Sequence, residues 1–195
     1  MSSERVARIL ESQGFRELVS AHLFAAGVPL APTIDDKHML ADHAREELSH
    51  FEVISRLYEQ VTGKALYDVI GARASEVPSP RSWLEAAVAA YLVDRAAAVQ
   101  LREYQRVGDP RLDRVIDVVL EHEHEHMAAA ETALIDQARA TPATAKLAEE
   151  HVARWFAIAR GLLDEGPDTA RVAQSFATSV RVALSACGIA PPGSV

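Results

Sequence analysis

The sequence predicts an all-α protein that consists of a four-helix bundle followed by two additional C-terminal helices. Alanine is very common, runs of β-branched residues are short, and glycine and proline fall in clusters between long stretches that lack them. A chain of 195 residues with 49% hydrophobic content can bury one good core. We therefore expect a single domain over residues 1–195, with the core bundle at about 4–138 and accessory helices at about 142–188.

The breaks between these stretches define six helices. The expected helices cover about residues 4–26, 34–61, 82–105, 110–138, 142–166 and 168–188. Thr33 and Ser82 are the expected N-caps of two of them, because Asp36 and Glu85 follow three residues later. Short links join the first helix to the second and the third to the fourth, so each pair should form an antiparallel hairpin. The longer connection at 64–79 has room for a short helical turn.

Composition and charge exclude several classes of protein. A net charge of −8 argues against a broad basic surface for nucleic acid. The single cysteine, Cys187, cannot form an intramolecular disulfide and fits a reducing compartment. The N-terminus lacks the pattern of a signal peptide, and no stretch of about 20 uncharged apolar residues could span a membrane. We expect a soluble, cytoplasmic protein that binds neither membrane nor nucleic acid.

Two helices carry a Glu-x-x-His motif on their apolar side. The motifs are Glu47-Leu-Ser-His50 and Glu123-His-Glu-His126. Residues three apart lie on the same side of a helix, so each Glu and His can bind one ion. A single such motif usually lies at a protein surface. Here both motifs fall within an apolar stripe, which favours a buried metal site.

The second motif belongs to a run in which Glu and His alternate, so one pair must be chosen. Helical periodicity places Glu123 and His126 with the apolar positions of the helix. The competing pair, Glu121 and His124, falls on the outer side. Residues two apart do not face each other, so the three histidines cannot serve one site. The sequence therefore predicts that Glu123 and His126 point inward and that the rest of the run is solvated.

The first and third helices each offer one acid among apolar neighbours. Glu17 precedes Glu47 by 30 residues, and Asp94 precedes Glu123 by 29, so the two hairpins look like a duplicated unit. A carboxylate on an apolar face needs a partner, since burying an isolated charge is costly. One carboxylate on one helix and Glu-x-x-His on the next, used twice, is the di-iron carboxylate arrangement. Glu11, the rival of Glu17 on the first helix, should point outward.

The predicted metal ligands are thus four carboxylates and two imidazoles. They are Glu17, Glu47, His50, Asp94, Glu123 and His126. This set suits two iron ions, with manganese as the alternative metal, and leaves coordination positions open for oxygen. Four other histidines have no inward-facing partner and should be surface or core residues, whereas His122 and His124 belong to the solvated side of their helix. The four are His22, His38, His43 and His151.

Five segments carry a resemblance to a known family. They are Glu17 followed by Ala31–Thr33, then Glu47–His50, Tyr91–Asp94, Glu123–His126 and Arg154–Phe156. At these segments the chain resembles the catalytic subunit of the multicomponent phenylacetyl-CoA epoxidase, in the ferritin-like superfamily. The resemblance implies a ferritin-like bundle, a phenylacetate-catabolism type of oxidoreductase, and Asp94 rather than a glutamate as the third-helix ligand. Because this chain is shorter, we expect it to differ from that subunit in having no long C-terminal extension, and no basic residues for a coenzyme A phosphate stand out.

A second, more local resemblance covers one helix. Residues 44–51, Ala-Arg-Glu-Glu-Leu-Ser-His-Phe, are similar to the di-iron tRNA hydroxylases. The hypothesis is a non-haem di-iron monooxygenase that activates O₂ to hydroxylate or epoxidise a small organic or acyl-thioester substrate. Its expected partners are an electron-donating reductase and a second copy or a related subunit.

Three alternatives stay open. A ferritin-like ferroxidase would oxidise and store iron, although ferritin-type centres generally carry fewer histidines. A tRNA-hydroxylase-like enzyme would share the metal site and differ in substrate. A non-catalytic scaffold subunit would be expected to have lost ligands, whereas this chain keeps all six.

Overall fold

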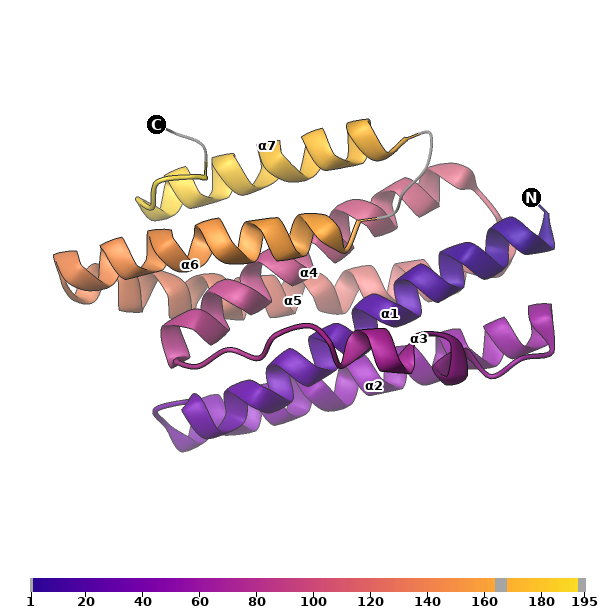
Figure 1. Ribbon diagram of the computed structural model, residues 1–195, viewed down its shortest axis with the longest axis horizontal. Helices are drawn as coiled ribbons and strands as arrows, with labels where there is room; N and C mark the ends of the chain where they lie inside the picture. Colours follow the sequence, from indigo (N-terminus) through magenta and orange to yellow (C-terminus); the bar gives the residue numbers. More distant parts are fainter. Residues whose placement is uncertain (1, 164–167, 193–195) are drawn as a thin grey trace. The chain divides into compact units, whose positions relative to one another are not determined.

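The computed structural model describes residues 2–163 and 168–192, and its described regular elements are all helices, with no strand among them (Figure 1). The helices are α1 (Ser3–Gly27), α2 (Ile34–Thr62), α3 (Leu66–Ala74), α4 (Trp83–Val107), α5 (Pro110–Ala140), α6 (Pro142–Gly161) and α7 (Thr169–Cys187), with a 3-10 turn η1 (Val28–Leu30) after α1. The predicted all-α fold is confirmed. The short turn expected within residues 64–79 is a full helix, α3, and α6 ends at Gly161. Its predicted end near Gly166 lies outside the described residues.

Local capping chemistry sets where the helices begin. The side chain of Thr33 accepts a hydrogen bond from the backbone N–H of Asp36 at 3.1 Å and so opens α2. The hydroxyl of Ser82 accepts one from the N–H of Glu85, also at 3.1 Å, ahead of α4. Thr141 and Thr144 form a reciprocal capping box at the start of α6. These bonds satisfy N–H groups that have no partner inside the helix.

The contacts divide the chain into two compact units. Unit 1 is Met1–Ser79 with Leu101–Glu121, and unit 2 is Pro80–Gln100 with His122–Val195. Helices α4 and α5 are each divided between the units, with one segment in unit 1 and the other in unit 2. The single domain expected from the sequence stays a prediction. No described helix has the length and apolar content that crossing a membrane requires.

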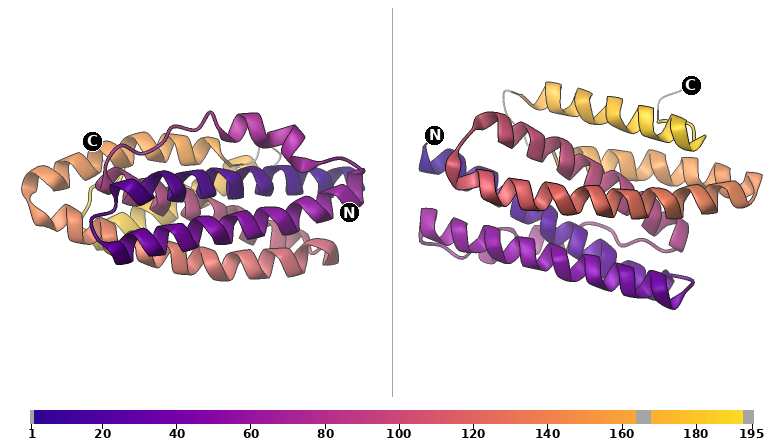
Figure 2. Two further views of the ribbon diagram at one scale, coloured as in Figure 1. Left: turned by 90° about the horizontal axis from the view of Figure 1, so that it is seen from below. Right: turned by 180° about the vertical axis from the view of Figure 1, so that it is seen from behind.

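Unit 1 is built on the antiparallel hairpin of α1 and α2, which run side by side (Figure 2). Helix α3 packs against α1 next to Gly14. A Cβ atom at Gly14 would lie 2.6 Å from the side chain of Leu66 and 3.4 Å from that of Ile54, so glycine permits this close approach. Leu66, Ile54 and Ile70 are almost completely buried there. Their burial explains why α3 forms although its sequence gives only a weak helix signal.

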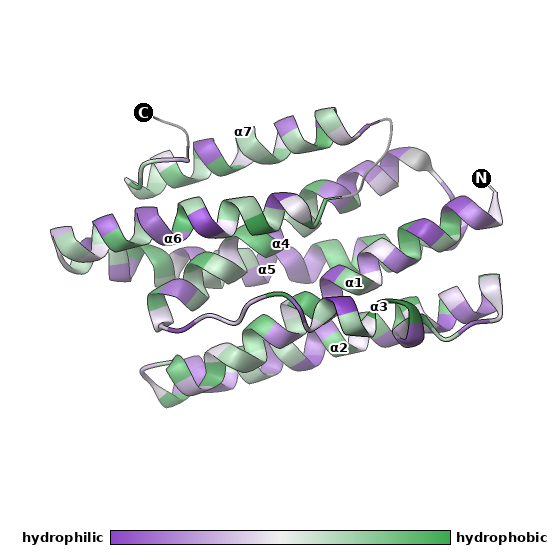
Figure 3. Ribbon diagram, viewed as in Figure 1, coloured by the Kyte–Doolittle hydropathy of each residue, from purple (hydrophilic) through white to green (hydrophobic). Residues whose placement is uncertain are grey.

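Unit 2 is held together by aromatic side chains of α6 and α7. The rings of Phe156 and Phe176 stack with centroids 5.2 Å apart, which joins the two helices. Trp155 is completely buried, and its indole N–H donates a hydrogen bond to the carboxylate of Glu85 on α4 at 3.1 Å. Figure 3 shows polar and apolar residues alternating along the α6 ribbon, as expected for a helix with one buried side.

The corner between α4 and α5 is closed by Asp109. Its carboxylate accepts hydrogen bonds from the backbone N–H of Arg111 at 3.1 Å and from the guanidinium of Arg111 at 2.7 and 2.9 Å. These bonds hold the pKa of Asp109 well below its usual range. The preceding residue, Gly108, has a φ of +63°, a left-handed conformation that glycine adopts without strain.

The lowered pKa of Asp109 predicts how the protein responds to acid. Stability from a carboxylate with a depressed folded pKa is fully present above its unfolded pKa, about 4, and is lost as pH falls below that value. We expect the free energy of unfolding of Asp109→Asn to fall less steeply than that of the wild type between about pH 4 and pH 2. Urea unfolding at several pH values measures both slopes. Asp42→Asn, at an exposed position, should follow the wild type; equal slopes for all three proteins would contradict the prediction.

Candidate metal centre

Unit 1 brings three of the predicted ligands together in its core. Glu17 comes from α1, and Glu47 and His50 lie one turn apart on the facing helix, α2. One ligand atom of each residue lies within 4.8 Å of the ligand atoms of the other two. The relative exposures are 1% for Glu17, 0% for Glu47 and 5% for His50, so all three are buried. We call these residues cluster 1.

Protons and hydrogen bonds balance the buried charge of cluster 1. The Nδ1 atom of His50 lies 3.0 Å from Oε2 of Glu17 and 3.7 Å from Oε2 of Glu47. Burial raises the pKa of Glu17 to about 8; the charge of Glu47 acts in the same direction, and the hydrogen bond to His50 opposes it. Burial lowers the pKa of His50, but its hydrogen bond to Glu17 and its interaction with the nearby carboxylate of Glu47 outweigh burial and raise that pKa to about 10. In the absence of a cation, cluster 1 therefore retains protons that a cation would displace.

Unit 2 brings the other three predicted ligands together. Asp94 lies in α4, and Glu123 and His126 lie one turn apart on α5. Their ligand atoms also lie within 4.8 Å of one another, and each residue is at most 1% exposed. Asp94 belongs to a stretch of α4 in which nearly every residue from Leu84 to Leu101 is buried. We call these residues cluster 2.

The alternating run on α5 separates into a buried and a solvated side. Glu123 and His126 are buried, whereas Glu121, His124 and Glu125 are exposed. A helix rotates by about 100° per residue, so positions 123 and 126 fall on one side and positions 121 and 124 on another. The structure therefore places in the core the pair that helical periodicity selects.

Two buried polar side chains, Gln13 and Arg16, are joined to Glu17 by hydrogen bonds, and the sequence predicted no role for them. The side-chain amide of Gln13 donates to Oε1 of Glu17. Arg16 donates to Oε1 of Gln13 from Nε at 3.2 Å and from Nη2 at 2.8 Å. The signal available in the sequence was the four-residue spacing of Gln13 and Glu17 on one apolar side of α1.

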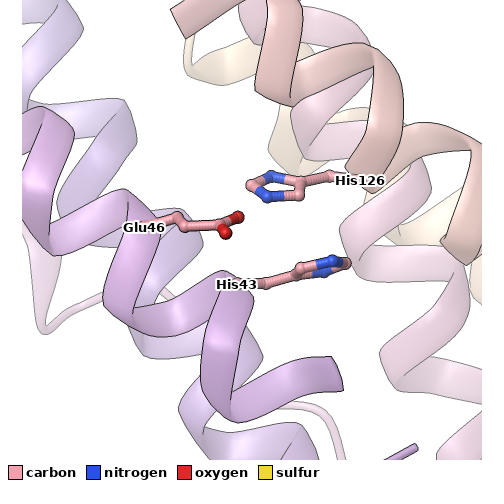
Figure 4. Close-up of side chains that lie close together, drawn as sticks. All are labelled: His43, Glu46 and His126. Carbon is pink, nitrogen blue, oxygen red and sulfur yellow. The ribbon is translucent and has the colours of Figure 1, made fainter. Parts of the chain in front are cut away.

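Glu11, His43 and Glu46 are acids and histidines that lie outside clusters 1 and 2. Glu11 was expected to point outward; it is half-buried instead and accepts a hydrogen bond of 2.6 Å from the hydroxyl of Tyr58, which is buried. His43 and Glu46 project from the same side of α2, one turn apart, and both are half-buried (Figure 4). The rings of Phe24 and His43 pack edge to face, with their centroids 5.1 Å apart. No role is predicted for Glu46 from the sequence, although its spacing of three residues from His43 places both residues on one side of a helix.

The donor atoms of the two clusters are of the same kind. Each cluster offers two carboxylates and one imidazole, and each places the Glu and His of one helix against the acid of a second helix. Carboxylate oxygens and imidazole nitrogens suit iron and manganese, and thiolates, which would favour zinc or copper(I), are absent from both groups. The residues present therefore fit a pair of such ions.

Comparison with known proteins identifies the family. A family model described as a ferritin-like domain of actinomycetes matches residues 2–179, which include every residue of both clusters. No curated protein matches the sequence.

Proposed function

The chain belongs to this family of ferritin-like domains, and on that premise we propose that it is a di-iron carboxylate oxygenase. The observation that carries the proposal is the repeated cluster of two buried carboxylates and one imidazole. The proposed ligands are Glu17, Glu47, His50, Asp94, Glu123 and His126. The metal is iron, with manganese as the alternative that the same donors would hold.

A bound metal pair would supply the reduction of O₂ by external electrons, with one oxygen atom entering the substrate and the other leaving as water. The net reaction of substrate R–H with O₂, two electrons and two protons gives R–OH and water, and epoxidation balances in the same way. The chain's own residues bind and orient the ions, and His50 holds a proton against Glu17 when no cation is present. Phe24 on α1 and Tyr91 on α4 are buried aromatic side chains of the helices that carry Glu17 and Asp94, and they would help to keep water from the ligands.

The substrate and partners form the finer part of the proposal. The segments that resemble the phenylacetyl-CoA epoxidase subunit support a small organic or acyl-thioester substrate. We propose a cytoplasmic site of action, because the single cysteine fits a reducing compartment. An oxygenase of this class needs two electrons per turnover, so we propose a separate reductase as electron donor. A second copy of the chain or a related subunit is proposed as a partner.

Iron binding under anaerobic conditions tests the proposal. Purified protein is loaded with Fe²⁺, excess metal is removed, and the iron per chain is counted before exposure to O₂. We expect about two irons per chain and sustained O₂ consumption only when a reductant is supplied. Glu47→Ala should lose iron because it removes a buried carboxylate of cluster 1, whereas the exposed Glu52→Ala on the same helix should not. Many irons per chain, taken up without a reductant, would instead show the storage function of a ferroxidase.

A further inference from the structure

We propose that Gln13 and Arg16 are a buried positioning pair that fixes the carboxylate of Glu17 for metal binding. The inference rests on the proposed metal site and adds two residues that do not touch the metal. Both lie on α1, within one turn of Glu17, and both are almost completely buried, with relative exposures of 3% for Gln13 and 1% for Arg16.

The hydrogen bonds determine which way the amide of Gln13 points. A guanidinium has only donors, so the side-chain atom of Gln13 that Arg16 contacts twice must be the carbonyl oxygen. The NH₂ group of Gln13 then faces the other way, toward Oε1 of Glu17. Reversal of the amide would place NH₂ against the guanidinium and oxygen against the carboxylate, and both contacts would be repulsive. Arg16 thus makes Gln13 an obligatory donor to Glu17.

This donor gives the two oxygens of Glu17 different partners. Oε1 is bound by Gln13, and Oε2 lies 3.0 Å from Nδ1 of His50, within cluster 1. The carboxylate cannot rotate about its last bond without breaking both contacts. Oε2 is therefore fixed on the side that faces Glu47 and His50, where it could bind a metal ion. Hydrogen bonds that orient ligands in this way usually contribute strongly to metal affinity.

The guanidinium of Arg16 is itself fixed at its other end. Its Nη2 donates to the hydroxyl of Tyr104 at 2.8 Å, and its Nη1 donates to the hydroxyl of Ser12 at 2.9 Å. Tyr104 belongs to the part of α4 that lies in unit 1, and it is also buried. A continuous chain of hydrogen bonds therefore runs from α4 through Arg16 and Gln13 to the carboxylate of Glu17.

Metal affinity distinguishes a positioning role of Gln13 and Arg16 from a purely structural one. Removing a buried hydrogen bond lowers stability in either case. Only a positioning role changes the affinity of cluster 1 for a cation and the geometry with which the cation is bound. The test therefore measures binding and the visible spectrum of bound Co²⁺, with no reaction involved.

Co²⁺ is titrated into the full chain carrying His126→Ala, which takes the imidazole from cluster 2 and leaves cluster 1 intact. In this parent, Gln13→Met keeps the length of the side chain and removes the donor. We expect the affinity of cluster 1 for Co²⁺ to fall about 10- to 100-fold, with a changed visible spectrum. Gln137→Met is the matched control, because the side chain of Gln137 donates to the backbone of its own helix, at 3.2 Å to the carbonyl of Ala133. The control should keep the affinity and the spectrum of the parent.

Arg16→Lys provides a second variant. Lysine keeps the positive charge but presents a single ammonium in place of the planar guanidinium that binds Gln13 twice. We expect a smaller loss of Co²⁺ affinity in the same direction. If circular dichroism shows that Gln13→Met does not fold, Arg16→Lys decides alone. Parental affinity and spectrum in the folded variants would overturn the inference and leave the proposed function standing. Failure of the parent and of the wild type to bind Co²⁺ would overturn both.

Discussion

His126→Ala is expected to bind about half as much iron as the wild type, whereas His124→Ala binds the full amount. His126 is 1% exposed and lies in cluster 2 with Asp94 and Glu123. His124 is exposed, two residues away on the same helix. Loss of the imidazole leaves two carboxylates to hold an ion, and we expect the affinity of cluster 2 to fall more than about 100-fold, beyond the range typical of residues that only orient ligands.

The two histidine variants make the measurement a matched pair. Both change the same residue type within one turn of α5, so a general effect of removing an imidazole would appear in both. Iron is counted after anaerobic loading, and binding is measured over a range of Fe²⁺ concentrations. Full binding by His126→Ala together with loss in His124→Ala would show that the wrong pair has been assigned to the metal.

The largest loss of stability is expected at Glu85. Its carboxylate is 3% exposed and accepts hydrogen bonds from the backbone N–H of Arg81 at 2.8 Å, the guanidinium of Arg154 at 2.6 Å and the indole of Trp155 at 3.1 Å. Burial acts to raise the pKa of Glu85, but these bonds and nearby positive charge lower it below its usual value. Glu85→Ala leaves the buried indole N–H of Trp155 without an acceptor. We expect the free energy of unfolding to fall by about 3 kcal/mol.

Thermal and urea unfolding measure this loss. A decrease of about 3 kcal/mol corresponds to a melting temperature lower by roughly 6 to 12 °C for a chain of this size. Glu85→Gln keeps an acceptor oxygen for Trp155 and should lose clearly less. Glu150→Ala, at an exposed position of α6, should stay within about 0.5 kcal/mol of the wild type. A loss for Glu85→Ala no larger than that of Glu150→Ala would show that the hydrogen bonds of Glu85 do not stabilise the folded state.

The parts of the fold that depend on local chemistry could be predicted from the sequence. The start of α2 at Thr33 and the start of α6 after Thr141 follow from capping residues that act within three positions. The buried side of α5 follows from helical periodicity, because a helix that carries Ile116 and Leu134 on one side must carry Glu123 there as well. The identity of these residues as metal ligands stays a prediction that the iron measurements decide.

Features that depend on contacts between distant segments could not be predicted. The sequence predicted no more than a helical turn where α3 lies. The full helix could not be predicted, because its burial depends on the space that Gly14 leaves on α1. On α2, Phe51 is a large apolar residue that is nevertheless only half-buried. The orientation of Gln13 depends on Arg16, which is fixed by Tyr104, 88 residues further along the chain. Helical periodicity gives the side of a helix but not the partner that a side chain meets.

Metal binding by the buried carboxylates would link the amount of folded protein to the supply of metal. Glu17, Glu47, Asp94 and Glu123 are each at most 1% exposed, and an ion held by them would bind the folded chain and not the unfolded one. By mass action, each tenfold rise in free metal above the dissociation constant adds about 1.4 kcal/mol to the free energy of unfolding. A gain of that size changes the unfolded fraction, on which proteases act, about tenfold. We therefore expect cells short of iron to contain less of this protein even at a constant rate of synthesis.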